Sequence, residues 1–289
     1  MWVKIQVAIS GLLALIMICS CKKDGPERVL TLDETRLNEL CTSKFNGRRA
    51  GTEGCDNAAR YLIEQLESSG YEVFVQQFRF KDAMDLKNIY VMIAGKSDSL
   101  LVVGAHYDGA VEGKHYQAAD DNGSGVVTLL SVCEYFSHSS HIESLHYSVI
   151  FAFWAAEELT KGTVYNGSRY FVSNFKERKK IRYYCNLDCF ARKGQDLMFY
   201  YSPSASYVLD RVGDYLHDYM TPGFHLLVKE SEKMNSDHVS FGEKGIPFFG
   251  WNDINTSGFA HTKDDSVEKI SFDKIRTVSK LTSHIIESL

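Results

Sequence analysis

Histidines and acidic residues recur through the middle of the chain, separated by long apolar stretches. Imidazole nitrogens and carboxylate oxygens are ligands of zinc, and a catalytic zinc site keeps one position open for water. Two metal ions about 3.5–4 Å apart need roughly five or six protein ligands, one of them shared by both ions. The chain offers two histidines and three carboxylates for this task, with a further carboxylate to transfer protons. The candidates are His106, one acid of the adjacent pair Asp120 and Asp121, Glu157, Glu158, Asp188 and His261.

None of these motifs is specific when taken alone. A histidine at the end of a strand is more often an ordinary core or surface residue. Asp-Asp-Asn-Gly is a common turn sequence, and paired glutamates usually lie on a solvated face. The complete set in this order is much rarer by chance, and it predicts a hydrolytic centre with two metal ions.

Most of these polar residues come directly after apolar runs that are typical of buried strands. The run 100–105 precedes His106, the run 147–156 precedes Glu157 and Glu158, and the run 183–187 precedes Asp188. In open α/β sheets, ligands bind at the carboxyl ends of the strands. We therefore expect the three groups to converge at one edge of a sheet.

Helical and strand-like segments alternate along most of the chain. Near-continuous apolar runs suit strands that helices cover on both faces. The alternation predicts an α/β fold with three layers, α/β/α, around a mixed, mostly parallel central sheet. The expected strands are 71–80, 88–94, 100–105, 147–156 and 183–187. The expected helices are 31–45, 52–69, 125–136, 168–175, 205–219 and 272–288. Because no internal repeat is visible, we expect residues 31–289 to form a single catalytic domain.

The first twenty residues differ from the rest of the chain. Lys4 precedes an apolar run (5–18) that has the length of a signal-peptide core and is short for a membrane-spanning helix. Small residues before Cys21 resemble a bacterial lipobox. We expect residues 1–20 to be a lipoprotein signal peptide and residues 21–30 a linker with lipidated Cys21. A plain signal peptide or a short anchor helix is the alternative. The lipid would anchor a soluble domain in the bacterial cell envelope, on the periplasmic or surface side of a membrane.

Charge and cysteine content limit the possible partners and cross-links. The formal net charge is -5 and no basic stripe is visible, so we expect no nucleic-acid partner. Five cysteines follow Cys21, and an odd number leaves at least one thiol unpaired. A disulfide between Cys41 and Cys55 and a set of free thiols both remain open. The other cysteines are Cys133, Cys185 and Cys189.

Six short motifs together resemble the zinc aminopeptidases of peptidase family M28, which include bacterial leucine-type and streptomycete aminopeptidases. The motifs span residues 104–264, and Gly-Thr-Glu-Gly at 51–54 extends the resemblance towards the N-terminus. They are Gly-Ala-His-Tyr-Asp (104–108), Ala-Asp-Asp-Asn-Gly-Ser-Gly (119–125), Ala-Ala-Glu-Glu (155–158), Asn-Leu-Asp (186–188), Ser-Asp-His (236–238) and His-Thr-Lys-Asp (261–264). The resemblance implies hydrolysis of the N-terminal bond of peptide substrates.

The resemblance also assigns metal ligands. Asp121 would bridge two Zn²⁺ ions. His106 and Asp188 would complete one zinc site, and Glu158 and His261 would complete the other. Each of these side chains is of a type that zinc accepts.

The same resemblance assigns the general base, and two stretches of the sequence differ from the family pattern. Glu157 would take a proton from water and deliver it to the leaving amine. The family pattern suggests a cis peptide bond between Asp121 and Asn122.

The segment 158–168 is longer than in many relatives, and Cys189 replaces their usual methionine. The preferred N-terminal residue therefore cannot be carried over from relatives.

Acidic residues near the ligands are expected to support them. Asp108, two residues after His106, could accept the second imidazole N–H and fix the tautomer. Asp264 could support His261 in the same way, although Asp265 is an equally close candidate. The alternative for each is an ordinary loop acid.

Three further residues are expected beside the ligands. Asp120 would lie next to the bridging residue without binding metal. His238 would contact substrate, or cap the helix that follows it. Trp251, in the aromatic segment 248–251, would line a pocket for the first substrate side chain, or pack in the core.

Other functions compete with the aminopeptidase. A glutaminyl-peptide cyclotransferase shares this fold with one Zn²⁺, but the motifs at 121–125 and 155–158 are peptidase-like. A carboxypeptidase or dipeptidase is possible because the metal centre alone does not select a terminus. A non-catalytic binding protein would have lost ligands that are present here. A serine hydrolase would need a Gly-x-Ser-x-Gly elbow, which the chain lacks.

Overall fold

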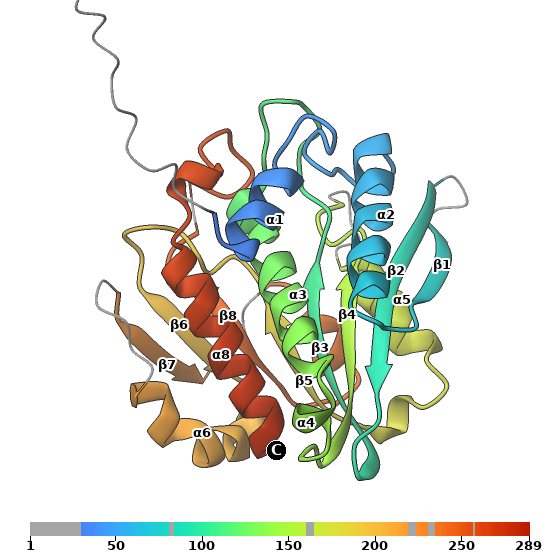
Figure 1. The fold of residues 1–289 in the computed structure, drawn as a ribbon, viewed down its shortest axis with the longest axis vertical. Coiled ribbons are helices and arrows are strands. Elements are labelled where there is room, and N and C mark those ends of the chain that lie inside the picture. Colours follow the sequence, from blue (N-terminus) through green and yellow to red (C-terminus); the bar gives the residue numbers. More distant parts are fainter. Residues whose placement is uncertain (1–29, 81–83, 160–164, 219–223, 231–234, 257) are drawn as a thin grey trace, which may run out of the picture. The chain divides into compact units, whose positions relative to one another are not determined.

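One mixed sheet of eight strands organises the part of the chain that the structure, a computed structural model, describes: residues 30–80, 84–159, 165–218, 224–230, 235–256 and 258–289. The strand order is β1-β2-β4-β3-β5-β8-β6-β7 (Figure 1). The bounds are β1 Phe74–Phe80, β2 Met84–Ile93, β3 Ser97–His106, β4 Tyr147–Trp154, β5 Ile181–Leu187, β6 Leu197–Tyr201, β7 Leu226–Glu230 and β8 Phe248–Asp253.

The centre of the sheet is parallel, and antiparallel pairs join its flanks. β3 pairs in parallel with β4 and β5, and β5 pairs in parallel with β8. β2 joins β4 and β6 joins β8 in antiparallel fashion. In the register, His106 lies opposite Trp154 and Leu187 lies opposite Trp251. The carboxyl ends of the four central strands therefore share one edge of the sheet.

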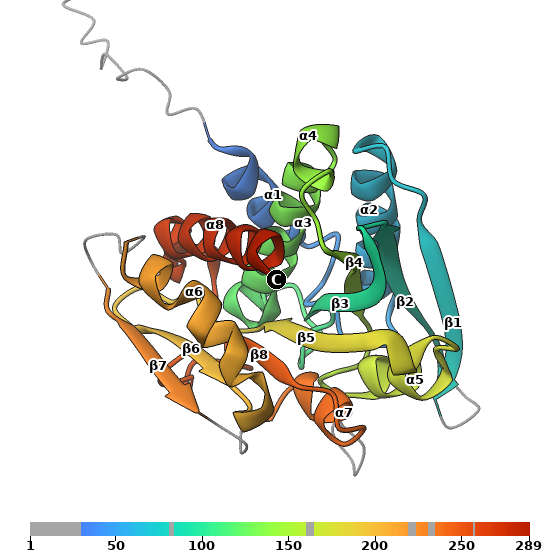
Figure 2. The same ribbon diagram turned by 90° about the horizontal axis from the view of Figure 1, so that it is seen from below.

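Helices cover both faces of the sheet, which confirms the predicted α/β/α architecture (Figures 1 and 2). One face carries α1 Leu32–Leu40, α2 Glu53–Ser68, α3 Gly125–Phe136, α6 Ser206–Asp218 and α8 Phe272–Ser288, with the short α4 Ser139–Ile142 beside them. The other face carries α5 Asn166–Asn174 and α7 His238–Gly242. Along β3, Leu101 and Val103 pack with the first helices, whereas Leu100 and Val102 pack with the second.

The predicted elements are present, most with slightly different ends. The helices predicted at 125–136 and 272–288 have those bounds, whereas the helix predicted at 31–45 ends at Leu40. A capping box begins that helix: Thr31 N–H donates to the Glu34 carboxylate at 2.8 Å, and Glu34 N–H donates to Thr31 Oγ1 at 3.3 Å. Strands β6, β7 and β8 were not expected. They are only five or six residues long, and such short segments carry little periodic signal.

Two sequence-based expectations concern the N-terminus and the cysteines. The predicted signal peptide and Cys21 lie outside the described residues. Within the described ranges, no helix is long and apolar enough to cross a membrane. Cys41 and Cys55 are free thiols, as are the three later cysteines, so the disulfide alternative is wrong. Burial raises the pKa of the Cys55 thiol to about 12, which keeps it protonated.

Candidate metal centre

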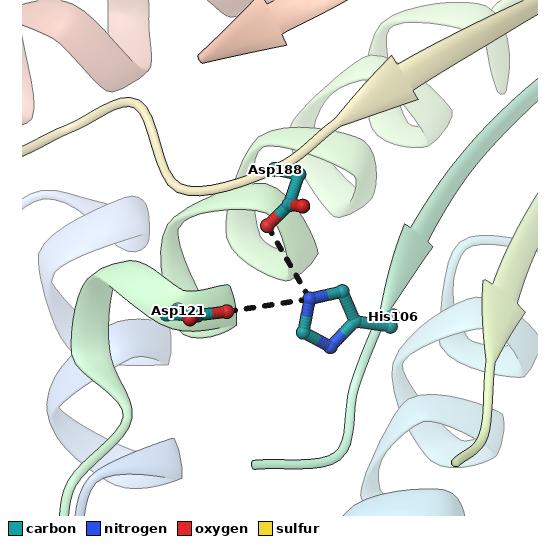
Figure 3. A group of neighbouring side chains, drawn as sticks. All are labelled: His106, Asp121 and Asp188. Atoms are coloured by element: carbon teal, nitrogen blue, oxygen red, sulfur yellow. Dashed lines mark hydrogen bonds and ion pairs between the residues drawn. The ribbon is translucent and has the colours of Figure 1, made fainter. Parts of the chain in front are cut away.

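Asp121 lies between two histidines that come from distant parts of the chain. Its Oδ1 is 3.4 Å from Nε2 of His106, and its Oδ2 is 3.2 Å from Nε2 of His261. The same Nε2 of His106 is 3.3 Å from Oδ1 of Asp188, and Figure 3 shows both carboxylates facing that ring. His106 ends β3 and Asp188 follows β5. Two strand ends therefore present ligand atoms to one oxygen of Asp121.

A second group of possible ligands surrounds the other oxygen of Asp121. Nε2 of His261 is 2.8 Å from Oε1 of Glu158. Asp121, Glu158 and His261 form one group of three possible metal ligands, and His106, Asp121 and Asp188 form another. The structure thus brings all five predicted ligands together, and Asp121 belongs to both groups.

The donor types and their separations fit zinc. Zinc–nitrogen and zinc–oxygen bonds of about 2.0–2.1 Å in tetrahedral geometry place neighbouring ligand atoms about 3.4 Å apart. The contacts of His106 with Asp121 and Asp188 are 3.4 and 3.3 Å. Four carboxylates line the surrounding cavity, and no lysine or arginine is among its described lining residues. Carboxylates gathered in this way can become protonated or bind a cation, and the two neighbouring histidines favour a metal ion.

Glu157 lies beside the ligands, within one group with His106 and Glu158. Burial raises the pKa of Glu157 well above its ordinary value, against the opposing effect of His106, and the charge of Glu158 adds to the increase. Burial also raises the pKa of Glu158, to about 8. For Asp121, burial is outweighed by hydrogen bonds from His106 and His261, which lower its pKa. Asp121 is therefore the more acidic of these carboxylates, and Glu157 binds a proton more readily than an exposed glutamate does.

Four of the five candidate ligands, Asp121, Glu158, Asp188 and His261, line a cavity of about 330 Å³. Its other described lining residues are Glu157, Tyr165, Cys189, Asn235, Asn252, Thr256 and Ala260. This volume is at the lower end of the range for ligand sites, and it suits one end of a peptide better than an extended segment. Neither Tyr165 nor Asn252 was expected from the sequence. Tyr165 lies in the lengthened segment after the base, and Asn252 lies in the unpredicted strand β8.

The match to a known family extends over the whole of this site. Residues 88–286 match the profile of Peptidase family M28, and this range contains all five ligands and Glu157. The chain belongs to peptidase family M28.

Several known enzymes are similar in sequence. Leupeptin-inactivating enzyme 1 of Streptomyces exfoliatus is 27% identical over 84% of this chain and 53% of its own length. Aminopeptidase Y of Saccharomyces cerevisiae is 28% identical over 66% of this chain and 36% of its own length. Leucine aminopeptidase 1 of Neurospora crassa is 24% identical over 90% of this chain and 69% of its own length. The chain thus spans about half or less of the first two relatives.

Two solved structures show the same fold. The LapA aminopeptidase of Legionella pneumophila superposes with a TM-score of 0.70 at 18% identity, over 88% of this chain and 71% of that chain. The glutaminyl cyclase of Porphyromonas gingivalis superposes with a TM-score of 0.72 at 21% identity, over 88% and 96% of the two chains. At these identities the likeness concerns the fold alone.

Asp108 supports this M28 site differently from the expected way. Its carboxylate accepts the backbone N–H groups of Glu157 at 3.0 Å and Glu158 at 3.1 Å. Nδ1 of His106 is 3.7 Å from that carboxylate but 3.2 Å from the backbone carbonyl oxygen of Asp108. The imidazole therefore lies within ion-pair distance of the predicted carboxylate but closer to the backbone carbonyl of the same residue. Ala156, with φ 61°, turns the chain so that the two following N–H groups face Asp108.

Asp265, and not Asp264, is the buried acid in the segment that follows His261. Asp265 accepts the backbone N–H groups of Asp120 at 2.6 Å and Asp121 at 3.1 Å, whereas Asp264 is exposed. The prediction that Asp264 supports His261 is wrong, because the buried carboxylate holds the backbone of the bridging residue instead. Asp120 in turn accepts Ala191 N–H at 2.7 Å, as a buried residue outside both ligand groups.

The turn that carries Asp121 includes the predicted cis peptide bond, between Asp121 and Asn122. The Asn122 side chain donates to the Leu187 carbonyl at 2.8 Å and accepts Gly125 N–H at 3.1 Å. A Cβ atom on Gly125 would lie 2.3 Å from Asn122 Oδ1 and 2.4 Å from Leu187 O. Only glycine fits there, so this turn and the end of β5 are held in close contact.

His238 and Trp251 lie outside the metal cavity. His238 begins α7, is buried, and has Nδ1 3.2 Å from the Tyr200 hydroxyl. It lines a separate cavity of about 450 Å³. Trp251 is fully buried in the core, and its indole N–H donates to Thr282 Oγ1 at 3.1 Å. The substrate-pocket role predicted for Trp251 is therefore wrong, and the core-packing alternative is correct.

Proposed function

We propose that the protein is an aminopeptidase that binds two zinc ions and hydrolyses the N-terminal bond of peptides. The placement of Asp121, whose two oxygens face His106 and His261, carries the proposal. A carboxylate shared between two ligand groups is what a pair of closely spaced metals requires. Family membership and the aminopeptidases among the relatives support the same activity.

The side chains of the cavity divide the reaction between them. When bound, zinc lowers the pKa of water and polarises a carbonyl group. Glu157 accepts the proton of the attacking water and returns it to the leaving amine. The Tyr165 phenol faces the same cavity; burial and then the charge of Glu157 raise its pKa, so it stays protonated. It is placed to donate a hydrogen bond to the developing oxyanion.

The charge of the cavity favours recognition of the peptide amino terminus. Asp121, Glu157, Glu158 and Asp188 line it, and its described lining residues include no lysine or arginine. A C-terminal carboxylate would find no lysine or arginine among these residues to pair with, whereas a free α-ammonium group can donate hydrogen bonds to the carboxylates. The described lining therefore argues against a carboxypeptidase.

A glutaminyl-peptide cyclotransferase is the second candidate. It is favoured by the likeness in fold to the Porphyromonas gingivalis glutaminyl cyclase. The superposition covers 96% of that cyclase chain, compared with 71% of the LapA aminopeptidase chain. Two complete ligand groups in place of one argue against it.

Mass spectrometry of peptides incubated with the purified protein tests the proposal. Zinc-loaded protein is expected to release free N-terminal amino acids, and a chelator should stop the release. Glu157→Gln should keep two zinc ions per chain and lose roughly 10²–10⁴-fold in activity. The exposed Glu67→Gln is the matched control. Loss of ammonia from N-terminal glutamine without cleavage, with one zinc per chain, would establish the cyclotransferase.

We also propose that Cys21 carries a lipid that anchors the protein in the bacterial cell envelope. The apolar run 5–18, the small residues before Cys21 and the two lysines after it support the proposal. Cells grown with a labelled fatty acid should label the full chain but not Cys21→Ser. Equal labelling of both would show that Cys21 is not the lipidated residue.

A further inference from the structure

One wall of the metal cavity is polar where a leucine-binding pocket would be apolar. Beyond the metal ligands, the described residues of this wall are Cys189, Asn235, Asn252, Thr256 and Ala260. None of these described residues carries a large aliphatic or aromatic group. Tyr165, the one aromatic residue among the described lining, belongs to the segment joined to Glu157, with Tyr165 N–H donating to Glu157 O at 3.2 Å.

Asn252 has a fixed orientation in this wall. Its side-chain Nδ2 donates to the backbone carbonyl of Asp188 at 2.9 Å. A carbonyl oxygen can only accept, so the amide cannot be flipped, and Oδ1 must point elsewhere. No described residue donates a hydrogen bond to that Oδ1. Asn252 is half-buried between the core residues Trp251 and Asp253 of β8. An oriented acceptor therefore lines the cavity next to a metal ligand.

The wall also offers donors. Thr256 is half-buried, and its hydroxyl can donate or accept. Asn235 is exposed at the rim, and its amide can do both as well. A side-chain amide presents an NH₂ group and a carbonyl oxygen together, which matches an acceptor and a donor on one wall. A leucine side chain would leave these groups without partners, and sites built for hydrogen bonds discriminate strongly against such analogues.

We propose that this wall selects peptides whose first residue carries a side-chain amide, asparagine or glutamine, over peptides that begin with leucine. The inference rests on the proposed aminopeptidase function, in which the α-amine lies among the acidic ligands and the first side chain meets this wall. Acidic first residues are disfavoured because their carboxylates can only accept hydrogen bonds and have no donor for Asn252 Oδ1. Selection among first residues thus depends on Asn252 and Thr256 and not on the metal ligands.

Competition among matched peptides tests the proposal. Zinc-loaded protein is given peptides X-Ala-Ala-Phe with X as Asn, Gln, Leu, Lys or Glu, and kcat/KM is measured for release of X. Asn and Gln should exceed Leu by about tenfold or more. Asn252→Leu should reverse the order, and Thr256→Val should reduce the preference without touching a metal ligand. Asn174→Leu is the matched control, because Asn174 Nδ2 also donates to a backbone carbonyl, at 2.8 Å, on the exposed end of α5.

The outcomes separate the inference from the proposed function. Release of Leu as fast as Asn and Gln would overturn the inference and leave the aminopeptidase intact. An unchanged preference in both Asn252→Leu and Thr256→Val, with two zinc ions still bound, would overturn it as well. Release of no residue from any peptide, or cyclisation of the Gln peptide alone, would overturn the proposed function and the inference together.

Discussion

The Asp108 carboxylate accepts the backbone N–H of Glu157 at 3.0 Å through Oδ1, while its Oδ2 accepts the next N–H, from Glu158, at 3.1 Å. Asp108 lies just beyond the end of β3, so one buried carboxylate fixes the chain that follows β4 to the chain that follows β3. Asp265 does the same for Asp120 and Asp121. In both cases, one buried carboxylate fixes the backbone of two adjacent acidic residues, and the side chains of these two residues face different ways.

Asp108→Asn is expected to weaken the site without unfolding the protein. An amide can accept only one of the two N–H groups, and its NH₂ opposes the other. Loss of such a supporting contact should lower activity or zinc affinity roughly 10–100-fold. The measurement is kcat/KM together with a zinc titration. The exposed Asp264→Asn should behave like the wild type. Wild-type values for Asp108→Asn would show that the two bonds do not position the base.

Asp121→Ala is expected to lose both zinc ions together, because each of its oxygens serves one ligand group. Asp188→Ala should lose only the ion on the His106 side, since Asp188 belongs to a single group. Zinc per chain, measured after dialysis against a weak chelator, distinguishes the two variants. Retention of one ion by Asp121→Ala would mean that Asp121 is not shared.

The sequence predicted that several candidate ligands would lie together, because they follow recognisable buried runs. His106 and Asp188 come after near-continuous apolar segments, and the carboxyl ends of such strands meet at one edge. The supporting contacts were harder to predict. The two-residue spacing of Asp108 from His106 suggested contact, but a left-handed residue, Ala156, brings different N–H groups to that carboxylate. Backbone conformation of this kind leaves no periodic signal.

The cavity wall could not be predicted for a related reason. Without β8, the alternation along 251–253 could not be assigned to faces, so Trp251 was a candidate for the pocket and Asn252 was not. In the structure, Trp251 packs in the core and Asn252 faces the cavity. Short aromatic segments are compatible with strand, loop or pocket, and only pairing with β5 and β6 makes this one a strand.

Tyr165→Phe is expected to reduce kcat while leaving KM and zinc content unchanged. Removal of a single hydrogen-bond donor to an oxyanion costs roughly 10²–10³-fold in rate. Tyr183→Phe, half-buried on β5 away from the cavity, is the matched control. An unchanged kcat for Tyr165→Phe would show that the phenol does not stabilise the transition state.

The metal-free protein is expected to lose stability as pH rises from about 5 to 8. Burial raises the pKa of Asp265 to about 6 and that of Asp237 to about 7, and hydrogen bonds to Asp121 and Glu158 raise the pKa of His261 to about 10. In each case the folded state binds more protons than the unfolded state in this window, so the free energy of unfolding falls as pH increases.

Urea titrations of chelator-treated protein at pH 5 and pH 8 measure this dependence. Asp265→Asn should flatten it, because a carboxyl whose pKa rises from 3.8 to about 6 contributes about 1.4 kcal/mol between pH 5 and pH 8. Zinc should reverse the trend, since ligands bind metal in their deprotonated forms and protons compete with zinc at low pH. A metal-free protein that is equally stable or more stable at pH 8 would contradict the prediction.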